Sequence, residues 1–216
     1  MELYDLVGMN DLRFSPFCWR TKAALAYKKI PYTTIPVRYV DKDKIAFSGQ
    51  GQVPVIKDNG TVVYDSWAIA GYLEDKQPDP KLFPGLGLKE ACRFFNLYVD
   101  RTLNPAIVRV IVTDIYAIVD PADQEYFRTT REQRLGVSFA EVAARRDESR
   151  LRLHALLADL EATITGQDYF FGLLTYADLC LFGSLKWVSV VSKEPLFDSA
   201  PALRAWWGRI QERLGL

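Results

Sequence analysis

The sequence has one histidine, three cysteines and no net charge, and each scarcity excludes a class of function. The single histidine, His154, lies in a charged helical stretch, so we expect it at the surface and expect neither a histidine-based metal site nor a catalytic triad. The cysteines at 18, 92 and 180 are far apart, which predicts no disulfide framework and no metal motif. With 27 basic and 27 acidic side chains, the composition favours no nucleic-acid or membrane-surface partner.

Long apolar runs are also missing. The chain contains no apolar run of about 18 residues, the length that a membrane span requires. No basic-then-apolar leader follows Met1 either, so we expect a soluble cytoplasmic protein without a membrane partner. The 216 residues are 49% hydrophobic, enough to bury a substantial core in one large domain or two small ones.

The first eighty residues alternate between strand and helix signals. We expect strands at residues 2–7, 32–37, 53–56 and 61–64 and helices at residues 16–29 and 66–76. Residues 41–52 are polar and predict a loop with one helical turn. Asn59-Gly60 is a strong signal for a two-residue hairpin turn. The order is therefore βαβ, loop, ββα, with the first two strands parallel.

A proline-rich stretch divides the chain. Pro78, Pro80 and Pro84 predict a linker over residues 78–87, between an N-terminal unit of residues 1–77 and a unit of residues 88–216. Beyond the linker the apolar residues recur with helical period over 88–118, over 138–164, from Thr175 onward and after Pro201. Asn104-Pro105 is expected to kink or break the first of these helices. The predicted fold class is α/β followed by all-α.

The stretch from Ser15 to Arg20 carries the strongest functional signal. Ser15 follows the first strand and begins a helix, with Pro16 in the first turn. A helix N-terminus offers unpaired N–H groups and partial positive charge, which can hold an anion, including a thiolate. The Ser15 hydroxyl can donate a hydrogen bond to such a thiolate, or Ser15 can act only as a helix cap. The sequence leaves both open.

Two further features suggest a ligand with a peptide backbone. Val53-Pro54 begins a strand and is a candidate cis bond, which would turn the Val53 N–H and C=O toward an extended ligand. Its alternative is an ordinary strand-edge proline. Asp65-Ser66 begins a second helix and offers a carboxylate to a ligand amine, or it simply caps that helix.

The loop at 41–52 supplies the remaining polar groups. Lys42, Lys44 and Gln52 can meet a ligand carboxylate, or they are solvated side chains of a loop. A ligand that fits all these features is zwitterionic at one end, anionic at the other, and carries a thiol in the middle. Glutathione has that pattern.

These motifs stand in an order and spacing that resemble a known family. Ser15–Lys22, Gln52–Ile56 and Asp65–Ala70 are similar to the glutathione-binding domain of cytosolic glutathione transferases. Further along, the segments 126–132, 135–136 and 175–179 resemble the bacterial lignin β-etherase-like branch and its fungal relatives.

The resemblance implies a thioredoxin-like N-terminal domain, an all-helical C-terminal domain, a homodimer, and glutathione as co-substrate without a metal. It implies that Ser15 is the catalytic residue that stabilises the glutathione thiolate, and that Asp178 caps a helix in a folding role. The residues implied to bind glutathione are Phe17, Lys44, Gln52, Val53, Pro54, Asp65 and Ser66, with Val53 on the cysteinyl backbone, Asp65 and Ser66 at the γ-glutamyl end, and Gln52 and Lys44 at the glycyl end.

The expected chemistry is attack of the thiolate on an apolar, aromatic electrophile, by conjugation or by ether cleavage. A non-catalytic binding module and a glutathione-dependent isomerase are the alternatives. Disulfide reduction is disfavoured because serine replaces the attacking thiol at position 15, and Cys18 is expected to be packed rather than reactive. The predicted substrate pocket is lined by Asn10, Leu12, Arg13, Phe14, Phe94, Tyr98 and Tyr116. Lys186-Trp187 can reach its rim.

Overall fold

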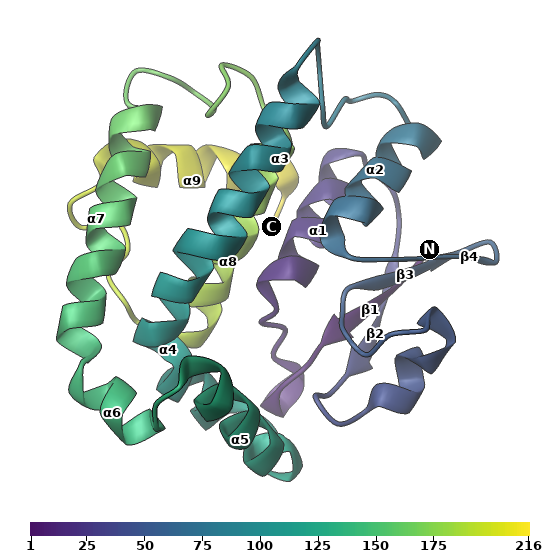
Figure 1. Cartoon of the computed structure of the whole chain (residues 1–216). Helices are drawn as coiled ribbons and strands as arrows, with labels where there is room; N and C mark the ends of the chain where they lie inside the picture. The colour runs from purple at the N-terminus through teal and green to yellow at the C-terminus, as the bar shows by residue number, and fades with distance from the viewer.

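The computed structural model describes residues 1–216 and places a small sheet with its helices beside a larger bundle of helices (Figure 1). The elements of the N-terminal part are β1 (Glu2–Leu6), η1 (Met9–Asp11), α1 (Pro16–Tyr27), β2 (Thr33–Val37), η2 (Lys42–Ser48), β3 (Val55–Asp58), β4 (Thr61–Tyr64) and α2 (Ser66–Lys76). The strands and helices predicted for this part are confirmed, with small shifts at their ends, and η2 supplies the helical turn expected in the loop.

The four strands form one sheet in the order β2-β1-β3-β4. β1 runs parallel to β2, because α1 provides the crossover between them, and antiparallel to β3. Asn59 and Gly60 have φ angles of 48° and 88° at the turn between β3 and β4, the left-handed conformation that a tight hairpin turn requires. The thioredoxin-like arrangement predicted for the N-terminal domain is confirmed.

The rest of the chain is helical, as predicted. Its elements are α3 (Leu88–Tyr98), the π-helical turn η3 (Val99–Leu103), α4 (Asn104–Ile118), η4 (Pro121–Asp123), α5 (Gln124–Leu135), α6 (Phe139–Ala144), α7 (Arg146–Ile164), α8 (Tyr176–Val191) and α9 (Pro201–Leu214). The predicted break at Asn104-Pro105 is instead a change to π-helical geometry just before it, and Pro105 sits in the first turn of α4, where a proline is tolerated. The helix expected at 138–164 is divided at Arg145 into α6 and α7.

The sequence did not predict α5. Most of its side chains are polar, and Phe127 is its only buried residue, so no apolar stripe with helical period marks it. Its end is signalled by Gly136, whose φ of 71° is the left-handed conformation common after a helix.

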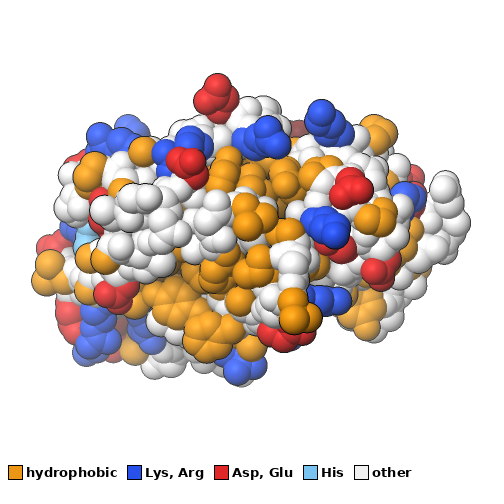
Figure 2. Space-filling model, turned by 90° about the horizontal axis from the view of Figure 1, so that it is seen from above, with side chains coloured by type: hydrophobic (Ala, Val, Ile, Leu, Met, Phe, Trp, Pro, Cys, Tyr) orange, Lys and Arg blue, Asp and Glu red, His pale blue; other side chains and the backbone are white.

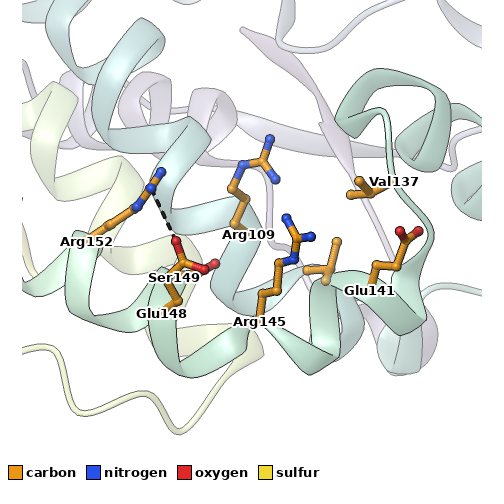
Figure 3. Close-up of a pocket in the computed structure, with 8 residues that line it drawn as sticks. Arg109, Val137, Glu141, Arg145, Glu148, Ser149 and Arg152 are labelled. Atoms are coloured by element: carbon orange, nitrogen blue, oxygen red, sulfur yellow. Dashed lines mark ion pairs between the residues drawn. The ribbon is translucent and has the colours of Figure 1, made fainter.

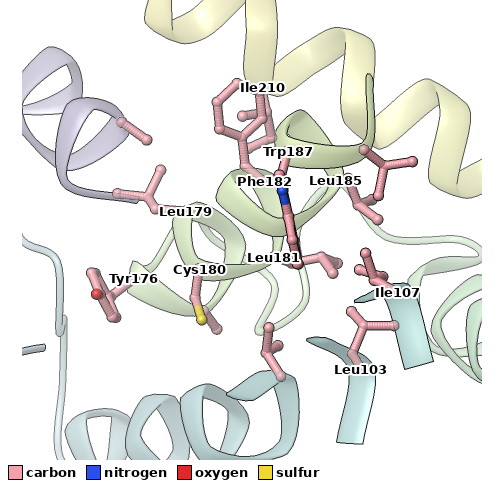
Figure 4. Close-up of a cluster of buried hydrophobic side chains, with 14 of the residues drawn as sticks. Leu103, Ile107, Tyr176, Leu179, Cys180, Leu181, Phe182, Leu185, Trp187 and Ile210 are labelled. Atoms are coloured by element: carbon pink, nitrogen blue, oxygen red, sulfur yellow. The ribbon is translucent and has the colours of Figure 1, made fainter. Parts of the chain in front are cut away.

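The core of the helical part is built around α8. Figure 4 shows side chains from Tyr176 to Trp187 extending from several sides of this helix toward Leu103, Ile107 and Ile210 of the surrounding elements. A helix that is apolar on all sides must be surrounded by other elements, and α8 is buried along most of its length. None of the helices combines the length and the apolarity that crossing a bilayer requires.

The N-terminal domain joins the helical bundle where α1 crosses α8. Arg20 of α1 is fully buried there, and its guanidinium lies 2.6 Å from Asp100 and 3.3 Å from the amide oxygen of Asn96. A buried charge is tolerated only with such partners, so this ion pair fixes α1 against the bundle. The predicted boundaries of the linker at residues 78 and 87 stay a prediction.

Gly183 makes this crossing possible. A Cβ atom at this position would lie 2.5 Å from the Pro16 carbonyl oxygen and 2.8 Å from the Arg20 nitrogen. We expect Gly183→Ala to lower the free energy of unfolding by about 2–3 kcal/mol, because neither backbone can move without separating α1 from α8.

Urea denaturation measures this effect, and Gly208→Ala is the matched control. A Cβ at Gly208 in α9 meets no atom within 4 Å, so the control is expected to be neutral or up to about 1 kcal/mol more stable. Equal stability of the two variants would show that α1 and α8 are not in close backbone contact.

Candidate functional site

Ser15 lies at the N-terminus of α1. It is 4% exposed, has extended backbone angles, and its Oγ accepts a hydrogen bond from the Cys18 N–H at 3.2 Å. Capping therefore occurs, as one of the two interpretations predicted. A hydroxyl that accepts a hydrogen bond still has its own proton to donate. The cap thus fixes the Oγ position and leaves Ser15 able to donate to an anion, so the two interpretations are compatible.

The Val53–Pro54 peptide bond is cis, as predicted. Val53 precedes β3, and its N–H and C=O form none of the backbone hydrogen bonds of the turns and loops. Gln50, which the sequence did not single out, orders the residues just before Val53. The Gln50 Oε1 accepts from the Gln52 N–H at 2.6 Å, and the Gln50 Nε2 donates to the Gln52 carbonyl at 2.9 Å. An ordered strand-like edge with free backbone groups is what an extended ligand pairs with.

Asp65 and Ser66 begin α2. Asp65 has a φ of 72°, which is sparsely populated for a residue with a side chain and often marks a functional position. Its Oδ1 accepts from the N–H groups of Trp67 and Ala68, both at 3.0 Å, while Oδ2 of this exposed side chain has no protein donor. Ser66 is held from the other side, because the Tyr176 hydroxyl of α8 donates to its carbonyl at 2.9 Å.

The strand register brings these groups to one edge of the sheet. Val55 lies opposite both Tyr4 of β1 and Tyr64 of β4. Pro54 precedes Val55 in β3 and Asp65 follows Tyr64 in β4, so both lie just beyond these paired residues at the same end of the sheet. β1 also leaves the sheet at this end, on its way to α1. Two helix N-termini and the cis-proline segment therefore face a common edge, where an anionic, peptide-like ligand can meet all three.

The loop lysines already have partners in the protein. Lys42 Nζ donates to the Gly51 carbonyl at 2.7 Å, and Lys44 Nζ lies 2.9 Å from Asp41. Although partial burial opposes the shift, hydrogen bonds from Lys44 and Arg38 lower the pKa of Asp41 to about 2. Asp41 is therefore ionised at neutral pH, and a ligand carboxylate at Lys44 would compete with it.

Two of the predicted pocket residues belong to an aromatic row that crosses from one domain to the other. The row consists of Phe14, Tyr39, Phe127, Phe139 and Tyr116, with ring centroids 5.3–6.2 Å apart from each to the next. α5 provides its central member, Phe127, and Arg131 of the same helix lies 4.8 Å from two of the rings. The sequence missed Phe127 because it gave no signal for α5, and it missed Tyr39, which follows β2, because nothing adjacent in the sequence pairs that ring with the helical part.

The structure does not bring Phe94 and Tyr98 to this row. Phe94 is 75% exposed, whereas its neighbour Phe95 points into the bundle toward Phe170, at 5.2 Å between ring centroids. Tyr98 packs beside Phe95. Adjacent helical residues point about 100° apart, so the apolar series along this helix does not share one face.

The remaining predicted pocket residues lie on the segment between β1 and α1. Arg13 is 14% exposed in its side chain and pairs with Asp11 at 2.8 Å and with the buried Asp5 at 3.4 Å. Asn10 is exposed, Leu12 is half-buried, and Phe17 at the start of α1 is 38% exposed. Lys186 lies over the Trp19 ring at 5.2 Å, while Trp187 is buried in the core.

The thiols of the three cysteines and the histidine ring are not part of the candidate site. All three cysteines are buried, and burial together with the nearby Asp5 raises the pKa of the Cys18 thiol well above its ordinary value. A thiol in that setting is packed rather than reactive, as predicted. His154 is half-buried rather than fully exposed, with its Nε2 3.6 Å from Glu194.

Comparison with known proteins matches both parts of the chain to family models. Residues 14–76 match the N-terminal domain of glutathione S-transferases, and residues 92–214, more than half of the chain, match their C-terminal domain. The glutathione S-transferase DHAR2 of Arabidopsis thaliana is 33% identical over 120 residues, which cover 52% of this chain and 56% of the relative. A maleylacetoacetate isomerase of Rattus norvegicus is 36% identical over 73 residues, covering 31% of this chain and 34% of the relative. The chain thus spans about half or less of these curated relatives.

One solved structure has the same fold as this chain over nearly the whole length of both proteins. It is a glutathione S-transferase of Ceriporiopsis subvermispora in complex with glutathione, 26% identical, covering 99% of this chain and 96% of the other, with a TM-score of 0.87.

Proposed function

This chain belongs to the glutathione S-transferase family, and we propose that it binds glutathione at the sheet edge described above and uses Ser15 to hold the thiol as a thiolate. The observation that carries this proposal is the Ser15 hydroxyl, fixed by its cap to Cys18 at a helix N-terminus. A free thiol has a pKa of about 8.5, and each unit by which it falls stabilises the thiolate by about 1.4 kcal/mol. One hydroxyl donor and the positive end of α1 together supply about one to two such units.

Each of the other residues at this edge binds a different part of the glutathione tripeptide. The backbone of Val53, before Pro54, pairs with the cysteinyl residue. Asp65 accepts the γ-glutamyl amine with Oδ2, and Ser66 binds the γ-glutamyl carboxylate at the N-terminus of α2. Gln52 and Lys44 bind the glycyl carboxylate, and Lys44 gives up its ion pair with Asp41 to do so. Phe17 covers the bound tripeptide from α1.

The electrophile in this proposal is an apolar aromatic molecule bound near the aromatic row. The thiolate sulfur attacks its electrophilic carbon, a carbon–sulfur bond forms, and the bond to an ether oxygen or a halide breaks, with the leaving group departing with the electron pair. The thiol proton goes to solvent. These rings, tilted or edge-on to one another at the junction of the two domains, offer apolar aromatic surface to a flat substrate, which is why we favour conjugation or aryl-ether cleavage.

Isomerisation is a second candidate, favoured by the sequence match to a maleylacetoacetate isomerase. In that reaction glutathione adds to a double bond and leaves again, so it is not consumed. A third outcome is a module that binds glutathione without turnover, since fold alone does not determine function.

Product analysis separates the three. The protein is incubated with glutathione and with aryl ethers, aryl halides and unsaturated carbonyl compounds, and products and remaining glutathione are measured by mass spectrometry. A glutathione adduct, or a cleaved ether, with matching loss of glutathione is the expected result. An isomer formed at constant glutathione would assign the isomerase activity, and binding without any product would contradict a catalytic role.

We further propose that the protein is a homodimer. Hydrophobic side chains gather over the middle of one face, with charged residues around them (Figure 2). Phe94 and Leu86 are among the most exposed apolar residues of the chain. Exposed apolar patches of this kind are commonly buried in an interface between subunits.

A further inference from the structure

A hollow separate from the glutathione-binding edge lies between α4, α6 and α7. Its volume is about 270 Å³, and the residues that line it are Arg109, Val137, Glu141, Val142, Arg145, Glu148, Ser149 and Arg152. None of them belongs to β1, α1, β3 or α2, the elements that form the proposed glutathione site. Figure 3 shows that the three arginines come from two directions, Arg109 from α4 and the others from the α6–α7 side.

The charges in the hollow are not balanced. Glu148 pairs with Arg152 at 3.2 Å. Glu141 is occupied by the cap of α6, where it accepts from the Ser138 N–H and hydroxyl at 2.9 and 2.8 Å. Arg109 and Arg145 take part in no ion pair, although most other arginines of the chain do. Arg109 and Arg145 thus face one small space without a carboxylate at ion-pair distance, although Glu141 lies close enough for the charge of Arg145 to help lower its pKa, after the hydrogen bonds from Ser138.

Such an arrangement favours an anion with several oxygens. Like charges that line one hollow repel each other, and a doubly charged ligand between them removes that repulsion. The planar guanidinium donates two parallel hydrogen bonds and fits phosphate geometry. The Ser149 hydroxyl adds a donor, and Val137 and Val142 provide an apolar wall for a small ligand body.

We propose that this hollow is a binding site for a phosphate group, either free or carried by a small apolar molecule. The volume limits the ligand, because sites for drug-sized molecules occupy about 300–1,000 Å³. Since the hollow shares no residue with the glutathione-binding edge, its occupancy does not depend on the proposed transferase activity.

Calorimetric titration of the full chain with phenyl phosphate tests this assignment. We expect saturable binding that weakens as salt is added, and a loss of affinity of about tenfold for each of Arg109→Gln and Arg145→Gln, because each removes a charge-assisted pair. Arg213→Gln is the control: Arg213 is an exposed, unpaired arginine at the end of α9, outside the hollow. It should bind like the wild type.

Titration with inorganic phosphate identifies the source of the group. Tighter binding of phenyl phosphate indicates a phosphate ester as the ligand, and equal binding indicates free phosphate. Wild-type affinity in the Arg109→Gln, Arg145→Gln double variant would overturn the proposal, as would equal binding of the neutral benzyl alcohol. Circular dichroism and an unchanged glutathione titration check that the variants are folded, which the exposure of both arginines leads us to expect.

Discussion

Ser15→Ala is expected to slow the reaction of bound glutathione about 5- to 20-fold at neutral pH, with little change in glutathione affinity. Loss of the hydroxyl donor returns the thiol pKa toward its free value of about 8.5, at which only about 3% of the thiol is ionised at pH 7. The groups proposed to bind the two ends of glutathione are untouched, which is why binding is retained. Steady-state kinetics at saturating glutathione, beside a calorimetric titration, measure the two effects separately.

The same substitution also removes a helix cap, so its control must remove a cap elsewhere. Ser138 accepts from the Glu141 N–H at 3.2 Å at the start of α6, much as Ser15 does at α1. Both alanine variants lose about 1 kcal/mol of stability. Only Ser15→Ala should lose activity. If Ser138→Ala loses as much activity, the effect of Ser15 is structural and the thiolate role fails.

Asp178→Ala is expected to destabilise the protein by about 3–5 kcal/mol, the largest effect on stability that we predict. Asp178 is fully buried at the start of α8. Its Oδ1 accepts from the Phe170 N–H at 3.1 Å and the Trp206 indole at 3.0 Å, and its Oδ2 accepts from the Thr175 N–H and hydroxyl. Alanine leaves these four buried donors without an acceptor, and it detaches α9 and the segment before α8 at once.

Glu141→Ala provides the comparison for Asp178. Glu141 forms the equivalent reciprocal cap at α6, but on the surface, where water replaces the lost acceptor, so about 1 kcal/mol is expected. Urea denaturation of both variants measures the two losses in the free energy of unfolding. Similar losses for the two would mean that the buried network around Asp178 contributes no more than an ordinary cap.

The N-terminal domain was predictable because its signals are local. Asn59-Gly60 determines its turn through two neighbouring residues, and Asp65 and Ser15 are recognisable caps in the sequence. The cap of α8 by Asp178 follows the same logic over three residues. In each case the residue type and a short spacing carry the information.

The features that the sequence does not signal depend on contacts between distant segments. α5 is polar because only Phe127 is buried, and that burial is visible only when Tyr39 of the other domain is in place. The place of Phe94 at the substrate pocket stays a prediction: the structure leaves this side chain 75% exposed on α3, and helical periodicity does not say which apolar face meets which neighbour. Nothing adjacent in the sequence indicates that Gln50 orders the loop before Val53.

The measurement that tests the central claim most directly is the pKa of the thiol of bound glutathione, followed by the ultraviolet absorption of the thiolate as pH is varied. For the wild type we predict a value about one to two units below the free thiol value of about 8.5, and for Ser15→Ala a value closer to the free one, because only the positive end of α1 then stabilises the thiolate. The same pKa in both proteins, or no depression in the wild type at saturating glutathione, would contradict the assignment of Ser15.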